Sequence, residues 1–208
     1  MKNTFEFEVS ADFGLFTDPN ISDKNTRISY PIPTYGALNG VCEAIFWQPT
    51  FIWVVDKVRV MEPIKTWEIA TSGIEWTGGR VILRDTFLVD PRYQVQAHFE
   101  WNPSRPDLKH DRIYGKYNAM IKHCLDKGGR KDPALGSKRA GMAFIEPCKF
   151  GEGDGFYDDS GKILFGSMYH SYDRSGGEAN KCPLWWQPVM ENGVIEFIRP
   201  EQCKRKAA

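Results

Sequence analysis

Residues 93–101 read Tyr-Gln-Val-Gln-Ala-His-Phe-Glu-Trp, a strict alternation of apolar and polar side chains. Successive side chains of a strand point to opposite faces of a sheet, so this stretch predicts a strand with one buried and one polar face. Residues 5–9 (Phe-Glu-Phe-Glu-Val) repeat the pattern, and residues 52–60 carry β-branched side chains with the same period. We therefore expect three strands in these stretches.

Two helices are predicted between these strands. Thr34 is the expected N-cap of a helix that stops before Pro49, because apolar residues follow at helical spacing: Leu38, Val41, Cys42, Ile45 and Phe46. A second, basic helix is expected to open at Pro106 and Asp107 and to close at Gly128 and Gly129. Its apolar stripe comprises Ile113, Tyr117, Met120, Ile121, Cys124 and Leu125.

The remaining elements complete a recognisable order. The pair Gly78 and Gly79 predicts a hairpin within residues 64–89, and Met142–Ile145 predicts a short buried strand. Residues 1–148 thus read strand, helix, strand, hairpin, strand, helix, strand. This order predicts an α+β fold: a ferredoxin-like (RRM-like) βαββαβ domain with an inserted β-hairpin.

The last part of the chain has a different character. Residues 149–208 predict a small all-β C-terminal lobe, with turns at 160–161 (Ser-Gly) and 192–193 (Asn-Gly). Its expected packing residues are Trp185, Trp186 and Phe197.

Composition narrows the class of protein. With 208 residues, 41% of them apolar, the chain can bury a sizeable core. No apolar signal core opens the chain and no run of 18 apolar residues occurs, so we expect a cytoplasmic protein with no membrane partner. Five widely spaced cysteines favour neither a disulfide framework nor a zinc site.

Charge is distributed unevenly along the chain. The formal net charge is zero, yet the segment Arg105–Arg139 holds ten basic residues against four acidic ones, which leaves the rest at minus six. Cations gathered on one element and the loop after it are typical of a nucleic-acid contact. The alternative interpretation is a solvated helix face followed by a mobile loop.

Two features inside this segment bear on that choice. Gly115 lies within the expected helix, where glycine costs roughly 1 kcal/mol relative to alanine. Either a phosphate backbone approaches there or the glycine relieves packing against the sheet. The glycine-rich loop 128–139 can cradle phosphate but lacks the order of a Walker loop. The RNA-binding candidates are Arg112, Tyr114, Gly115, Arg130, Lys131, Lys138 and Arg139.

No metal or cofactor is expected. The acidic turn at 153–159 does not have the spacing of a calcium loop, so we interpret Asp154, Asp158 and Asp159 as structural. The four histidines, His98, His110, His123 and His170, are not at ligand spacing.

Several motifs in order resemble one family. They are residues 5–19 (FEFEVSADFGLFTDP), 29–40 (SYPIPTYGALNG), 45–49 (IFWQP), 59–64 (RVMEPI), 151–157 (GEGDGFY) and 190–193 (MENG). They resemble the Dvulg subtype of the fifth CRISPR-associated protein family, the pre-crRNA processing subunit of type I-C Cascade. The resemblance spans nearly the whole chain.

This resemblance implies a ferredoxin-like domain with a β-hairpin, a C-terminal β-sheet lobe and metal-independent cleavage of repeat RNA. The implied partners are CRISPR repeat RNA, the 5′ handle of the crRNA and the other type I-C Cascade subunits; DNA is left open. The family's catalytic tyrosine, lysine and histidine match Phe46, Lys116 and Tyr117, so only the lysine is unchanged.

The implied reaction is attack by the 2′-hydroxyl before the scissile phosphate. Lys116 would stabilise the phosphorane, and Tyr117 would orient or deprotonate the 2′-hydroxyl. A phenol has a pKa of about 10 where an imidazole has about 6.5, so a base role needs a lowered pKa, and Lys116 is the visible group to lower it. His123 is an outside candidate for proton transfer or a surface histidine. The alternative function is a non-catalytic subunit that binds the crRNA 5′ handle.

Overall fold

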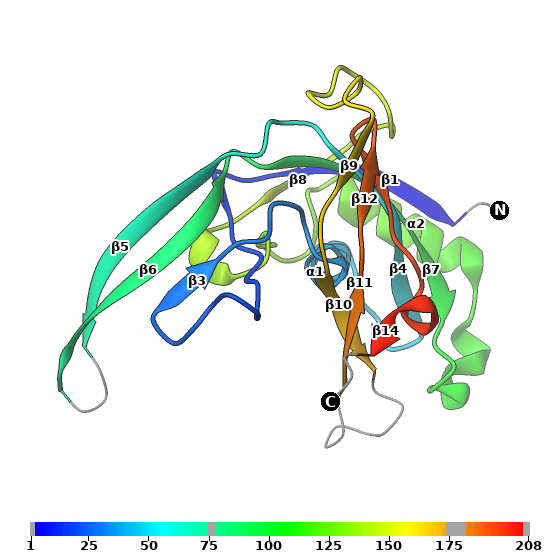
Figure 1. The fold of residues 1–208 in the computed structure, drawn as a ribbon. Coiled ribbons are helices and arrows are strands. Elements are labelled where there is room, and N and C mark those ends of the chain that lie inside the picture. Colours follow the sequence, from blue (N-terminus) through cyan, green and yellow to red (C-terminus); the bar gives the residue numbers. More distant parts are fainter. Residues whose placement is uncertain (1–2, 75–77, 174–181, 206–208) are drawn as a thin grey trace.

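The computed structural model describes residues 3–74, 78–173 and 182–205 (Figure 1). The fold is mixed α+β, with many strands and few helices. Its main layer is a seven-stranded sheet in the order β8-β1-β7-β4-β13-β12-β9, with every neighbouring pair antiparallel. The strands are β1 (Thr4–Ser10), β4 (Phe51–Val60), β7 (Arg92–Trp101), β8 (Phe144–Pro147), β9 (Lys162–Leu164), β12 (Val189–Glu191) and β13 (Val194–Glu196).

The alternating patterns of the sequence set the register of this sheet. Phe7 lies opposite Val95 and Val95 lies opposite Val58, so three fully buried side chains line up across the central strands. The strands predicted at 5–9, 52–60 and 93–101 are confirmed. Their shared apolar face explains why these short alternating segments assemble into one layer.

Two α-helices pack against this layer. α1 (Tyr35–Ile45) contacts β4, and α2 (Tyr114–Leu125) contacts β8 and α1. Thr34 is the N-cap of α1 as predicted, with its hydroxyl oxygen accepting from the Ala37 N–H at 3.3 Å. Short 3₁₀ helices are η1 (Pro106–Asp111), η2 (Lys138–Ala140) and η4 (Pro200–Gln202). None of the described helices has the length and apolar character needed to cross a membrane.

The prediction of one basic helix from Pro106 onward is wrong. Residues 106–111 form η1, and α2 begins only at Tyr114, after Ile113 in an extended conformation. The Arg112 side chain explains the break, because its Nη2 donates to the carbonyls of Asn102 (2.8 Å) and Arg105 (3.2 Å). These contacts hold the chain in a bend that a continuous helix would not permit.

Gly115 consequently differs from its expected setting. It is the second residue of α2, in the first turn, and not in a helix interior. A Cβ built there meets nothing within 4 Å, so relief of packing against the sheet does not explain the glycine. Its position leaves open space beside the Lys116 backbone.

The hairpin predicted within residues 64–89 is confirmed and forms a long arm. β5 (Thr66–Ile74) pairs with β6 (Arg80–Val89), and the arm projects from the body (Figure 1). Two short strands, β2 (Phe13–Gly14) and β3 (Thr26–Ile28), flank β6. Trp67, Ile74 and Ile82 are exposed on the arm.

The C-terminal part adds strands in two places. β10 (Met168–Asp173), β11 (Cys182–Trp186) and β14 (Lys204–Arg205) form a three-stranded sheet. The hairpin of β12 and β13 instead pairs with β4 and extends the main sheet. Its predicted turn is present, with positive φ at Asn192 (46°) and Gly193 (78°). Trp186 packs on Phe197 with ring centroids 5.1 Å apart.

Candidate active site

The end of α1 and the start of α2 bring the three matched positions together. Phe46 directly follows α1, and its ring centroid lies 6.4 Å from that of Tyr117 on α2. Both side chains are fully buried. Phe51 of β4 packs on Tyr117, with ring centroids 5.3 Å apart. Lys116 is beside them with its side chain 44% exposed. One partly exposed cation therefore stands over a buried aromatic cluster.

Asp111 connects the two polar groups of this cluster. Lys116 Nζ lies 2.5 Å from Asp111 Oδ1, and the Tyr117 hydroxyl contacts Asp111 Oδ2. The Tyr117 hydroxyl also lies 3.0 Å from Thr50 Oγ1. Because an ionised carboxylate only accepts hydrogen bonds, Tyr117 is the donor and Asp111 the acceptor in this contact.

This arrangement keeps the phenol protonated. Burial and the hydrogen bond to Asp111 raise the pKa of Tyr117 above its usual value, and Lys116 offsets this only in part. Lys116 forms an ion pair with Asp111, which raises the pKa of Lys116 and lowers the pKa of Asp111. Lys116 does lower the pKa of Tyr117, as the sequence suggests, but burial and Asp111 outweigh it, so the net shift of the pKa is upward. Tyr117 is placed to donate a hydrogen bond at neutral pH.

The first half of the basic loop returns to this cluster. The backbone N–H groups of Arg130 and Lys131 donate to the Ala44 carbonyl at 2.9 and 3.1 Å. The Arg130 guanidinium lies over the Phe46 ring, 5.4 Å from its centroid. Gly128 and Gly129 make the return possible with φ of 79° and 104°, which side-chain-bearing residues rarely adopt. The predicted residues Phe46, Arg130 and Lys131 thus meet at the end of α1.

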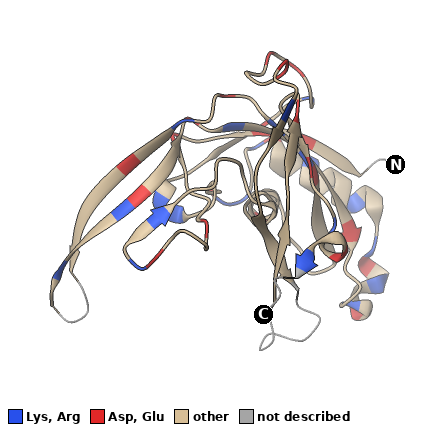
Figure 2. Cartoon of the chain, viewed as in Figure 1, with Lys and Arg blue, Asp and Glu red and all other residues tan. Residues whose placement is uncertain are grey.

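The second half of the loop lies elsewhere. Lys138 and Arg139 belong to η2, and Arg139 Nε is 3.0 Å from the buried carboxylate of Asp85 on β6. Figure 2 shows Lys and Arg both on α2 and at the base of the arm, so the basic segment does not form one cluster. The charge of Arg139 is balanced by Asp85, whereas Lys138 is exposed.

The other predicted RNA contacts have mixed surroundings. Arg112 uses its guanidinium on backbone carbonyls, as described above. Tyr114 is 46% exposed and packs on Trp101 with centroids 4.6 Å apart, so one side of its ring faces solvent. His123 lies exposed in the last turn of α2, about two turns from Lys116.

The acidic turn is tied to the polar face of the sheet. Arg59, whose side chain is 7% exposed, donates to both Asp158 oxygens at 3.0 and 2.5 Å and to the Gly153 carbonyl at 2.8 Å. Asp158 Oδ2 also accepts from the Gly155 N–H at 2.8 Å. Asp158 thus neutralises a buried arginine. In the described ranges, no group of three or more His, Cys, Asp or Glu side chains is arranged to hold a metal ion.

Two residues of the cluster, Asp111 and Thr50, are not predicted from the sequence. In the sequence, Asp111 is one of four acidic residues in the basic segment, and its position just before the helix that carries Lys116 and Tyr117 is the one signal of its role. Thr50 is distant in sequence from Tyr117, and only the fold places it there. No local pattern predicts such a contact.

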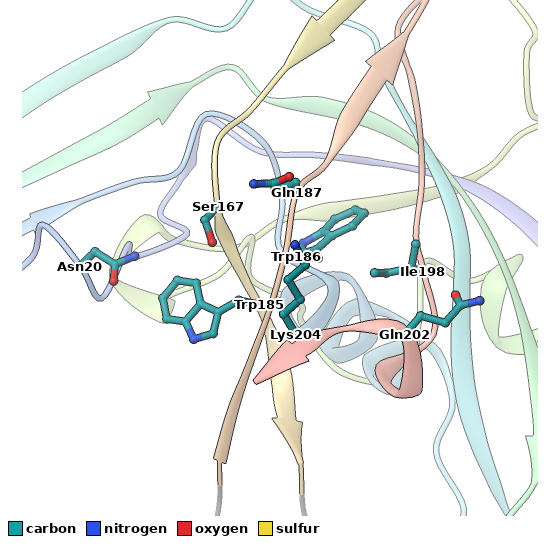
Figure 3. Close-up of a pocket in the computed structure, with 8 residues that line it drawn as sticks. All are labelled: Asn20, Ser167, Trp185, Trp186, Gln187, Ile198, Gln202 and Lys204. Atoms are coloured by element: carbon teal, nitrogen blue, oxygen red, sulfur yellow. The ribbon is translucent and has the colours of Figure 1, made fainter. Parts of the chain in front are cut away.

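A separate cavity of about 490 Å³ lies in the C-terminal part (Figure 3). The indoles of Trp185 and Trp186 lie on opposite sides of β11, as expected for successive strand residues. The other lining residues are Asn20, Ser167, Gln187, Ile198, Gln202 and Lys204. The lining residues include none of the predicted site residues, so this cavity is distinct from the cluster.

Comparisons with known proteins agree with this fold. The family model Cas_Cas5d, described as "CRISPR-associated protein (Cas_Cas5)", matches residues 4–198. A relative from Mannheimia succiniciproducens, named CRISPR pre-crRNA endoribonuclease Cas5d, is 37% identical over 99% of this chain and 100% of its own. A Thermus thermophilus protein of the same name is 27% identical over 91% and 89%. The chain belongs to the Cas5d family of CRISPR-associated proteins.

Solved structures show the same architecture. A crystal structure of a CRISPR-associated protein matches with a TM-score of 0.78 and 29% identity, covering 96% of this chain and 94% of the other. A functionally uncharacterized protein from Streptococcus mutans matches with a TM-score of 0.78 and 29% identity, over 97% and 95%. A chain of a CRISPR RNA-guided surveillance complex matches with a TM-score of 0.52 and 12% identity, over 92% and 91%, which shows the fold alone.

Proposed function

We propose that this chain is an endoribonuclease that cleaves CRISPR repeat RNA, the pre-crRNA, without a catalytic metal ion. The observation that carries the proposal is family membership along the whole chain, with both curated relatives named pre-crRNA endoribonucleases. The site supports it, because Lys116 and Arg130 are exposed cations beside the buried Tyr117.

The cluster suits attack by an RNA 2′-hydroxyl. The 2′-hydroxyl loses its proton as its oxygen bonds to phosphorus, and the 5′-oxygen takes up a proton as its bond to phosphorus breaks. The products are a 2′,3′-cyclic phosphate and a 5′-hydroxyl. The nucleophile is part of the RNA. Lys116 stabilises the charge of the phosphorane, and Arg130 adds a second cation. Tyr117 donates its one proton to Asp111, so it orients the 2′-hydroxyl by accepting a hydrogen bond on its phenol oxygen. Asp111 is the positioning residue for both Lys116 and Tyr117.

Fold details support a finer assignment. The strand order β8-β1-β7-β4, with α1 and α2 in the two connections, is the order of a ferredoxin-like βαββαβ unit. We assign residues 1–148 to this RNA-processing domain and residues 149–208 to the all-β lobe. The two share a sheet through the pairing of β13 with β4.

The partners follow from the same proposal. The protein remains on the 5′ handle of the crRNA and joins the other subunits of a type I-C Cascade. The arm supports a protein contact, because Trp67, Ile74 and Ile82 are exposed on a two-stranded ribbon that has little core of its own. DNA contact is left to direct measurement.

A specific observation favours a second function, a non-catalytic subunit that holds the crRNA 5′ handle. Phe46 has no hydroxyl, and the Tyr117 phenol is buried with a raised pKa, so two of the three matched positions offer no base at neutral pH. In that case the same cations bind RNA but do not accelerate its cleavage.

One assay separates the two functions. Purified protein is incubated with labelled repeat RNA in EDTA, and the product ends are analysed, with Lys116→Ala as the matched control. We expect a single cut with a 2′,3′-cyclic phosphate end that Lys116→Ala largely abolishes. Tight binding without any cut would favour the scaffold, and a cut that requires added metal would contradict the proposed mechanism.

A further inference from the structure

A groove of about 360 Å³ lies beside the active-site cluster. It is formed by one face of α1, the connection to β4, the start of β4 and the loop after β7. The lining residues are Asn39, Glu43, Trp47, Pro49, Phe51, Ile52, Trp53, Asn102, Ser104 and Arg105.

The groove shares its wall with the site. Phe51 lines the groove and also packs on Tyr117, with ring centroids 5.3 Å apart. Thr50 stands between the lining residues Pro49 and Phe51, and its Oγ1 lies 3.0 Å from the Tyr117 hydroxyl. Phe51 and Thr50 are therefore the residues that connect the groove to Tyr117.

Trp47 is the unusual residue of this groove. Its side chain is 54% exposed, whereas Trp53, which also lines the groove, is 4% exposed and donates its indole N–H to the Phe46 carbonyl at 2.8 Å. No aromatic ring in the described part of the chain packs against Trp47. An indole with about half of its surface open to solvent is the type of platform on which unpaired nucleobases stack.

The polar groups of the groove divide by charge. Arg105 lies at one end, paired with Asp107 at 2.7 Å on the surface, and such an exposed pair can exchange its carboxylate for a phosphate. Glu43 and Asn39 line it from α1, with the Asn39 amide donating to Glu43 at 3.4 Å. The α1 wall is rich in acceptors, which disfavours phosphate there and suits the N–H groups of a base.

We propose that this groove binds one unpaired nucleobase of the repeat RNA, stacked on Trp47, next to the scissile phosphate. The base edge faces Asn39 and Glu43, and the backbone phosphate of that nucleotide lies toward Arg105. This inference rests on the proposed RNA substrate, and it makes Trp47 a positioning residue for one nucleotide of the repeat.

The test is a binding cycle that does not depend on cleavage. Repeat RNA with 2′-fluoro groups, which lacks the nucleophile, is titrated against wild type, Trp47→Ala and Trp47→Phe. The control is Tyr172→Ala, another aromatic that is 49% exposed but lies on β10. Each protein is also titrated with RNAs that carry a single abasic site at successive positions.

We expect Trp47→Ala to weaken binding about 5- to 100-fold, Trp47→Phe to weaken it much less and Tyr172→Ala to leave it unchanged. One abasic position should weaken binding to wild type but not further weaken binding to Trp47→Ala. Unchanged binding by Trp47→Ala, or loss that is coupled to no single base, would overturn the proposal. If wild type does not cleave repeat RNA but this coupling appears, the cleavage proposal fails and the groove proposal stands.

Discussion

The guanidinium of Arg130 lies over the ring of Phe46, with 5.4 Å between Arg130 Cζ and the ring centroid. This contact brings the loop after α2 back to the end of α1 and places a cation beside the Lys116 cluster. A hydroxyl is absent at position 46, but the ring still supports a charge. The basic loop therefore contacts the candidate site through its first residues, Arg130 and Lys131, while its last residues lie at the base of the arm.

This division predicts unequal roles for two cation pairs. Arg130→Ala with Lys131→Ala should weaken binding of repeat RNA and reduce the slope of log K against log salt by about 1 to 2. Lys138→Ala with Arg139→Ala should do less, because Arg139 is already neutralised by Asp85. Filter binding at several salt concentrations gives both slopes. Equal losses for the two double variants would contradict the division.

Asp158 should matter for stability and not for chemistry. Asp158→Asn leaves the buried Arg59 guanidinium with carbonyl and amide partners only, so we expect a loss of about 1 to 3 kcal/mol in unfolding free energy. Urea unfolding measures this loss, with Asp154→Asn as the exposed control. RNA cleavage in EDTA should persist under folding conditions. A loss of cleavage that magnesium or manganese restores would show a metal role instead.

His170 predicts an acid-sensitive fold. It is fully buried between Tyr35, whose ring centroid is 4.4 Å away, and the Ile198 carbonyl, which accepts from Nε2 at 3.0 Å. Burial lowers the pKa of His170 to about 4, whereas an unfolded histidine titrates near 6.5. As the pH falls, the unfolded state binds a proton at a higher pH than the folded state does. The His170 contribution to the unfolding free energy is therefore fully present above about pH 6.5 and decreases by roughly 2 to 3 kcal/mol toward pH 4.

The comparison variant for this prediction is His170→Gln, which keeps a donor but does not titrate in this range. It should be less stable than wild type near pH 7.5 because it loses the stack on Tyr35. The gap should narrow as the pH falls to 4.5, as followed by urea unfolding at both pH values. A gap that stays constant would mean that His170 does not carry the pH dependence.

Elements with a clear period were predictable from the sequence. Strands β1, β4 and β7 and helix α1 followed from apolar spacing, because burial on one face imposes that spacing. β2 and β3 span two and three residues, too few to show any period. The start of α2 was misplaced because the Arg112 side chain, bonded to carbonyls of another segment, decides where the helix begins.

The site was predictable only in part. Phe46, Lys116 and Tyr117 came from a family resemblance, and the structure brings them together. The protonation of Tyr117 depends on Asp111 and on burial under Phe51, which are tertiary facts. The split of the basic loop is likewise set by Ala44 and Asp85, partners that no local charge count can reveal.

Lys116 should be the most sensitive position of the cluster. Lys116→Ala removes the cation that we propose stabilises the phosphorane, so single-turnover cleavage of repeat RNA should slow by about 10²-fold or more. Binding should change little, because one contact among several cations carries little of the affinity. The variant also leaves Asp111 without its cation, with only the hydrogen bond from Tyr117, so Asp111→Asn with Lys116→Ala is the matched control. Wild-type cleavage rates for Lys116→Ala would place the site elsewhere.

The pH dependence of cleavage tests the state of Tyr117. Because its pKa is raised, a protonated phenol that orients the 2′-hydroxyl predicts no tenfold rise in rate per pH unit toward alkaline pH. Tyr117→Phe should then slow cleavage at every pH by a similar factor. Tyr117→His should raise the neutral-pH rate, because an imidazole beside Asp111 is a base of suitable pKa. Single-turnover rates between pH 5.5 and 9.5 decide the matter: a phenol-like rise in wild type that Tyr117→Phe abolishes would instead make Tyr117 the general base.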